Sequence, residues 1–158
     1  MNLVEILGVE AGLAPKDITG AAQAATYVSL KNFTGVMVLL HQGAWAGGTP
    51  AVTFEQATAI AGTGAKALTI RAYYQKPAVT AGVWTRTAVV ASTFNLPATA
   101  NTITVVEIDG SDLDASNDFD CLQAKVASPG ANADLLSISY LLRGPKYPQA
   151  ILSDAKVD

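Results

Sequence analysis

The chain has 158 residues, the length of one ordinary domain, which is enough to bury a core of its own. Only 15% of its residues are charged, its net charge is −3 and its ten basic residues are scattered, so the composition argues against a nucleic-acid-binding protein. It has one histidine, His41, and one cysteine, Cys121, and therefore few of the groups that acid–base, thiol or metal chemistry requires.

Nothing in the sequence predicts a membrane segment or a leader. The apolar run 36–40 is far shorter than the roughly 20 residues that span a bilayer. The first residues, 1–5, do not form a basic region followed by a hydrophobic stretch. We therefore expect a protein made in a cytoplasm without a signal peptide, and the single cysteine agrees with that expectation.

The first 24 residues do not show the pattern of a strand. Residues 2–7 are long enough for one or two helical turns, but Gly8, Gly12, Pro15 and Gly20 then interrupt any regular element. The sequence predicts an extended N-terminal arm over residues 1–24.

Eight β-type runs follow, each rich in Val, Ile, Thr or aromatic residues. Alternation with a period of two is clear in several, for example at Val52, Phe54 and Gln56 against Thr53 and Glu55. The runs cover residues 25–30, 34–41, 51–58, 66–74, 82–91, 101–108, 119–127 and 134–142.

The connections between these runs supply Gly, Pro or Asn where the chain must reverse, as in 43–50, 61–64, 95–100 and 128–132. Strands without intervening helices favour antiparallel pairing. The sequence predicts an all-β fold, an eight-stranded antiparallel two-sheet sandwich of jelly-roll-like type, over residues 25–143.

Residues 144–158 contain Pro145 and Pro148 with mixed charge, and predict an extended C-terminal arm. Two arms on one sandwich cost conformational entropy unless a neighbour orders them, so we expect their apolar residues to contact a partner. Trp45, in a glycine-rich loop, is a further candidate anchor. An ordinary flexible terminus, or an indole that only packs over the sandwich end, is the simpler alternative. The candidate partner-binding residues are Leu3, Ile6, Leu7, Trp45, Tyr147, Ile151 and Leu152.

The most conspicuous polar feature is an acidic segment. It holds six of the chain's 13 acidic residues, namely Glu107, Asp109, Asp112, Asp114, Asp118 and Asp120. Counted from Asp112 as an EF-hand loop, the sixth position is Asn117 in place of glycine and the twelfth is Gln123 in place of glutamate, so that motif fails. An irregular cation site and a carboxylate pair for glycoside hydrolysis remain alternatives to a solvated connection.

We predict no catalytic, cofactor-binding or metal-binding residues. His41 has no second histidine to share a metal or complete a triad, and a structural or surface role is expected. Cys121 lies in a strand-like run and is expected to be a small buried hydrophobic residue. The run 61–66 only superficially resembles a phosphate-binding loop, because it lacks the spacing and no helix follows it.

Several segments resemble a known group of proteins. They are ATAIAGTGAKAL at 57–68, NDFDC at 117–121, VASPGANADLL at 126–136 and RGPKYP at 143–148. Together they resemble the small capsid cement, or decoration, proteins of tailed bacteriophages, over most of residues 25–148. The resemblance implies a jelly-roll-like sandwich that binds the outside of an icosahedral head as dimers or trimers. It brings no catalytic residues.

The first hypothesis is therefore a virion structural protein, not an enzyme, on the outer surface of the phage head. Its expected partners are the major capsid protein and further copies of itself, as a homodimer or homotrimer, without nucleic acid, membrane or cofactor. The alternative is a tail- or fibre-associated sandwich that recognises host-surface glycan through Trp45 and the acidic segment.

Overall fold

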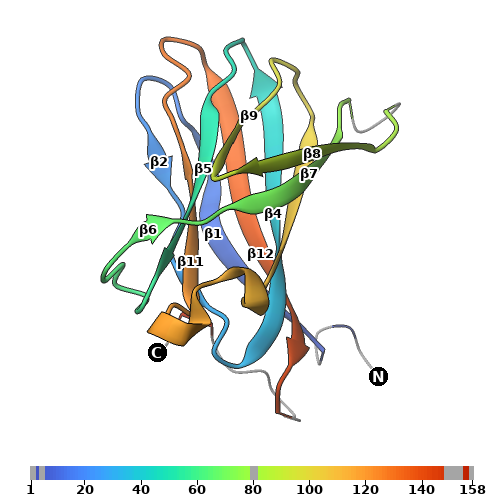
Figure 1. Ribbon diagram of the computed structural model, residues 1–158. Coiled ribbons are helices and arrows are strands. Elements are labelled where there is room, and N and C mark those ends of the chain that lie inside the picture. The colour runs from blue at the N-terminus through green and yellow to red at the C-terminus, as the bar shows by residue number, and fades with distance from the viewer. Residues whose placement is uncertain (1–2, 4–5, 79–81, 148–154, 157–158) are drawn as a thin grey trace.

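The computed structural model describes residues 3, 6–78, 82–147 and 155–156, which form two antiparallel sheets (Figure 1). One sheet, here the β4 sheet, has the strand order β1-β12-β4-β10-β7-β8. Its strands are β1 (Leu7–Asp17), β12 (Asp134–Pro145), β4 (Phe33–Trp45), β10 (Ile103–Asp109), β7 (Ile70–Lys76) and β8 (Thr85–Ala91).

The other sheet, here the β5 sheet, has the order β2-β11-β5-β6, with β3 also paired to β11 and β9 to β5. Its strands are β2 (Gln23–Ala24), β11 (Cys121–Val126), β5 (Ala51–Ala57), β6 (Lys66–Ala67), β3 (Val28–Ser29) and β9 (Thr93–Asn95). Two short 3-10 turns, η2 (Gly110–Asp112) and η3 (Ala115–Asn117), join β10 to β11. The all-β class is confirmed, as is the antiparallel pairing of both sheets.

The core lies between the two sheets and follows from the alternation along each strand. In β4, Val36, Val38 and Leu40 are buried, while the residues between them are half-buried on the outer face. Tyr140 of β12 lies opposite Val38 and is fully buried. Its hydroxyl accepts a hydrogen bond of 3.2 Å from the backbone N–H of Ala124 in the facing sheet. Burial raises the pKa of this hydroxyl, so it stays neutral and bridges the sheets.

The prediction of an N-terminal arm over residues 1–24 is wrong for residues 7–17, because they form β1. This strand pairs antiparallel with β12, with Leu7 opposite Arg143. The glycines that seemed to break the segment serve close packing. A Cβ at Gly12 would lie 2.6 Å from the Tyr140 ring, and Gly8 lies against Phe33. Pro15 is compatible with an edge strand, where one side needs no hydrogen-bond donor.

The strand count also differs from the predicted eight, since the described residues form twelve strands. The run 66–74 is divided because the chain changes sheets within it. The backbone of Leu68 still bonds to Phe54 in the β5 sheet, whereas Ile70 begins β7 in the β4 sheet. The run 25–30 contributes only the short strand β3, and β4 continues beyond His41 to Trp45.

The predicted C-terminal arm begins later than expected and returns to its own domain. Strand β12 extends to Pro145, where it lies opposite Phe33. Ala155 is buried in the core, and its carbonyl accepts a 2.7 Å hydrogen bond from the N–H of Ser29. The candidate residues Ile151 and Leu152 lie outside the described residues.

Candidate partner-binding surface at one end of the sandwich

Strand pairing brings the first residues of the chain and the residues after β12 to one end of the sandwich, here called the base. Since Leu7 lies opposite Arg143, the start of β1 adjoins the end of β12 (Figure 1). Leu3 and Tyr147 flank these strand ends and are 73% and 61% exposed. Ile6 is also exposed, while Leu7 is half-buried. Four of the predicted partner-binding residues therefore share the base, and the exposed ones present apolar surface there.

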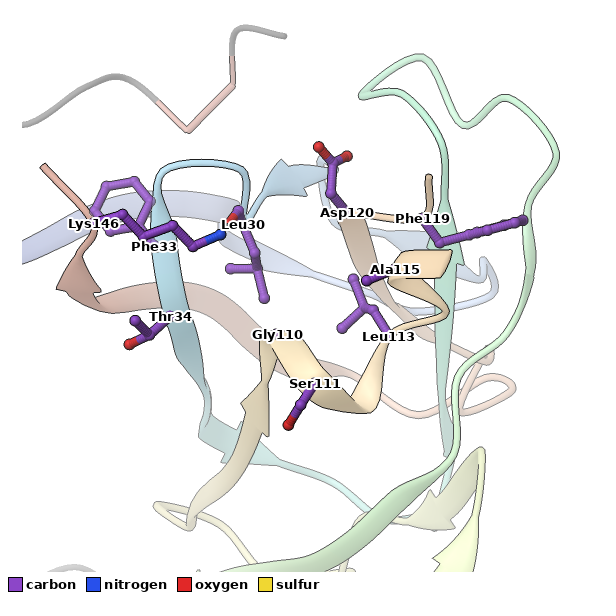
Figure 2. A pocket seen from close by; sticks show the side chains of 10 residues that line it. All are labelled: Leu30, Phe33, Thr34, Gly110, Ser111, Leu113, Ala115, Phe119, Asp120 and Lys146. Atoms are coloured by element: carbon purple, nitrogen blue, oxygen red, sulfur yellow. Dashed lines mark hydrogen bonds between the residues drawn. The ribbon is translucent and has the colours of Figure 1, made fainter. Parts of the chain in front are cut away.

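A groove also opens at the base, with a volume of about 290 Å³. Figure 2 shows that its lining comes from the β3–β4 connection, the start of β4, the β10–β11 connection with its two 3-10 turns, and Lys146 just after β12. Its apolar lining includes Leu30, Phe33, Leu113 and Phe119. Phe33 also packs next to Gly8 of β1, where an added Cβ would lie 3.3 Å from its ring, so the groove adjoins the apolar strand ends.

Lys146 lines one side of this groove. The Nζ of Lys146 donates to the carbonyls of Leu30 and Lys31, at 3.1 and 3.0 Å, which holds the residue after β12 against the β3–β4 connection. A second hollow of about 430 Å³ adjoins the groove and shares Phe119, Asp120 and Lys146 with it, while Lys31 and Asp118 line the second hollow alone. The base thus has an apolar floor with a charged rim, the usual arrangement of a protein interface.

The acidic segment runs along the base, and three of its carboxylates are already neutralised by strands of both sheets. The ion pairs are Asp109–Arg143, Asp112–Arg71 and Asp114–Lys66. Within the described part of the chain, no group of three or more His, Cys, Asp or Glu side chains could hold a metal ion. The arrangement fastens the β10–β11 connection to the sandwich; surface pairs of this kind contribute little stability individually.

Asp114 is the centre of the best-connected part of this segment. Its carboxylate accepts hydrogen bonds from Lys66, from Asn117 and from Ser116, the last two at 2.9 Å. These bonds, that from Lys66 first, lower the pKa of Asp114 to about 2. The Lys66 ammonium lies 3.9 Å from the centre of the Phe119 ring. The Asp114 carboxylate therefore stays negatively charged, and its hydrogen bonds to Ser116 and Asn117 hold η3 in place beside the groove.

The other residues singled out from the sequence lie elsewhere. Trp45 is at the opposite end of β4; its indole packs against the core and donates to the carbonyl of Gly48 at 3.2 Å. It is therefore not the open anchor that the sequence suggested. His41 is exposed on the outer face of the β4 sheet. Cys121 is fully buried, as predicted.

The structure also exposes apolar residues that the sequence reasoning missed. Val83 and Trp84, in the β7–β8 hairpin, are 78% and 53% exposed, and Val90 of β8 is 89% exposed. Trp84 lines a shallow hollow on the outer face of the β4 sheet with Tyr74 and Val105. The sequence predicts one strand over the run 82–91, whereas in the structure β8 begins at Thr85 and Trp84 lies in the β7–β8 connection. Among the described residues, no helix has the length and apolar character needed to cross a membrane.

Comparison with known proteins gives a likeness of fold. No family model and no curated protein matches the chain. Among solved structures, it is similar to the crystal structure of the SPBc2 prophage-derived protein YomS, with a TM-score of 0.50 and 9% sequence identity. The similarity covers 86% of this chain and 92% of that one. At this identity the likeness shows the fold alone: this chain has the sandwich fold of a prophage-derived protein over most of its length.

Proposed function

We propose that the chain is a structural protein of a bacteriophage particle, without enzymatic activity, that docks on the outer surface of the head and stabilises contacts between capsid subunits. The observation that carries this proposal is the base, where exposed Leu3, Ile6 and Tyr147 adjoin an apolar groove. Large apolar residues gathered on one end of a small domain mark an interaction site. The likeness to a prophage-derived protein supports a phage setting.

The strand order supports a jelly roll, the fold that the resemblance to cement proteins implies. In a jelly roll the strands pair in a nested way, the first with the last and so on inward. Here β1 pairs with β12, β2 and β3 with β11, β4 with β10, and β5 with β6. On this assignment the β7–β8 hairpin is an insertion that extends the β4 sheet.

The alternative, a glycan-binding module of the tail or fibre, gains no support from its proposed site. Trp45 is half-buried, with its indole N–H already bonded, so its ring offers no open stacking platform. The acidic segment is at the other end of β4, where the strand begins near Gly35. The two halves of that candidate site are therefore separated by the length of the strand.

Copy number and location on the phage particle test the proposal. We expect quantitative mass spectrometry of purified particles to find a copy number of the same order as that of the major capsid protein, and labelled antibody to decorate the head. A few copies confined to the tail would contradict head docking and favour the adhesion alternative. Absence from purified particles would contradict any role in the virion.

A further inference from the structure

The two edge strands of the β4 sheet, β1 and β8, differ in how far other segments of the chain cover them. At one edge, the outer side of β1 is covered by the protein itself: the Ala11 carbonyl accepts from Lys156 Nζ at 2.7 Å, and the Gly12 carbonyl accepts from the Thr26 N–H at 2.9 Å. Pro15 and two shifts in register further interrupt this edge. These are the devices by which proteins prevent pairing with another chain.

The opposite edge, β8, is covered by no other segment among the described residues; its pairing with β7 is regular from Thr85 to Ala88 and has one register shift, between Ala88 and Ala91. It pairs with β7 on one side, and among the described residues no strand lies on its other side. Alternate residues of an antiparallel edge strand direct their N–H and C=O groups outward, so β8 offers a row of backbone donors and acceptors. Its sequence, TRTAVVA, has no proline or glycine and a single charge, Arg86.

The side chains of β8 are as open as its backbone. Val90 has almost no contact with the rest of the domain, and Ala88 is also exposed. Trp84 and Val83 precede the strand on the same hairpin. In Figure 1, β8 lies next to β7 at the edge of the β4 sheet.

We propose that the β8 edge is the contact between two copies of this chain, paired antiparallel about a two-fold axis near Ala88, so that two β4 sheets become one continuous sheet. The strand is suited to pairing with itself. About Ala88, Arg86 would lie opposite Val90 and Thr87 opposite Val89, so that no like charges face each other directly. Pairing β8 with the covered β1 edge would instead give an open, head-to-tail chain of molecules.

This interface is independent of the head-docking proposal, because β8 and the base use different elements. It also specifies the oligomer. A two-fold contact of one edge with itself gives a dimer, so among the dimer and trimer expected from the sequence the geometry of β8 fits the dimer.

Sedimentation of the purified full-length chain tests the proposal. We expect a dimer, and we expect Val90→Lys to weaken self-association at least about tenfold by placing a charge at the paired edge. Since Val90 is 89% exposed, this change should leave the fold intact, which circular dichroism checks. The matched control is Val9→Lys, on the covered β1 edge, which should associate like the unchanged chain.

Disulfide cross-linking provides a second readout that does not depend on Val90→Lys. In a Cys121→Ser background, Ala88→Cys should form a covalent dimer under mild oxidation, whereas Val9→Cys should not. The proposal is overturned if the chain is monomeric or trimeric at high micromolar concentration, or if Val90→Lys dimerises normally and Ala88→Cys fails to cross-link. Loss of dimer with normal binding to phage heads would separate this interface from head docking.

Discussion

At the scale of single residues, two positions hold the base and the core in place. Gly12 lets β1 pass directly over the ring of Tyr140, whose hydroxyl in turn reaches the backbone of Ala124 in the facing sheet. Asp114 accepts hydrogen bonds from three side chains, those of Lys66, Ser116 and Asn117, and so orders η3 next to the groove. Neither role is visible from the residue type alone, since glycine reads as a strand breaker and aspartate as a solvated charge.

The close contact at Gly12 leads to the first prediction. Gly12→Ala should destabilise the protein by about 1–3 kcal/mol, the usual cost of forcing an extra carbon into a packed core, because the new Cβ would lie 2.6 Å from a ring that is fully buried. Urea unfolding measures the change. Ala14→Ser, an exposed position on the same strand, should be nearly neutral, and equal stability of the two variants would contradict this account of β1.

The hydrogen bonds to Asp114 predict a dependence on pH. Because they lower its pKa in the folded state from 3.8 to about 2, its stabilising contribution is complete above about pH 4 and is lost as the pH falls through 2. Asp114→Asn should therefore melt at a lower temperature than the unchanged chain at pH 6, with the difference shrinking towards pH 2. Asp118→Asn serves as the control from the same turn. A difference that stays constant over this range would show that the charge of Asp114 contributes nothing.

At the scale of elements, β1 changes the status of the N-terminal segment from an accessory arm to part of the fold. Its pairing extends along β12 from Leu7 to Asp17. Only the residues before Leu7 remain available for docking without cost to the sheet. The C-terminal segment likewise contributes to the fold, because Ala155 is buried in the core.

Two truncations separate these roles. Deleting residues 2–6 should leave the melting temperature nearly unchanged but weaken binding to heads, because Leu3 and Ile6 are exposed at the base. Deleting residues 2–17 should lower the melting temperature by at least about 10 °C, since it removes a whole edge strand and each kcal/mol shifts melting by about 2–4 °C in a chain of this size. Thermal unfolding followed by circular dichroism measures both. An unchanged melting temperature after the longer deletion would mean that β1 is dispensable.

The elements that could be predicted from sequence are those whose pattern is local. The runs at 51–58, 101–108, 119–127 and 134–142 correspond to β5, β10, β11 and β12 within a few residues. Strand β1 could not be predicted in this way, because its glycines are explained only by side chains distant in sequence, Phe33 and Leu142 for Gly8 and Tyr140 for Gly12. The candidate site could also be predicted only in part. Leu3 and Tyr147 were candidates from sequence, but their location at the same end of the sandwich depends on the pairing of β1 with β12.

At the scale of the whole molecule, a low-charge sandwich with an apolar base suits repeated docking on a large assembly. Only 15% of the residues are charged, so many surface positions are neutral and can be covered at small desolvation cost. If the chain docks as a dimer, two bases engage the head together, and weak single contacts are multiplied by effective concentration. We therefore expect high occupancy of the head without a tight single contact.

Rebinding to phage heads that lack this protein tests head docking through the base most directly. The unchanged chain is compared with a base variant, Leu3→Asp with Tyr147→Asp, and with an equally charged control at the opposite end, Thr49→Asp with Ala98→Asp, all four positions being exposed. Bound copies per head are counted after sedimentation. The account predicts saturable binding by the unchanged chain and the control, and at least tenfold weaker binding by the base variant, on the order of 1.4 kcal/mol. Equal binding by the base variant, or loss of binding only in the control, would contradict it.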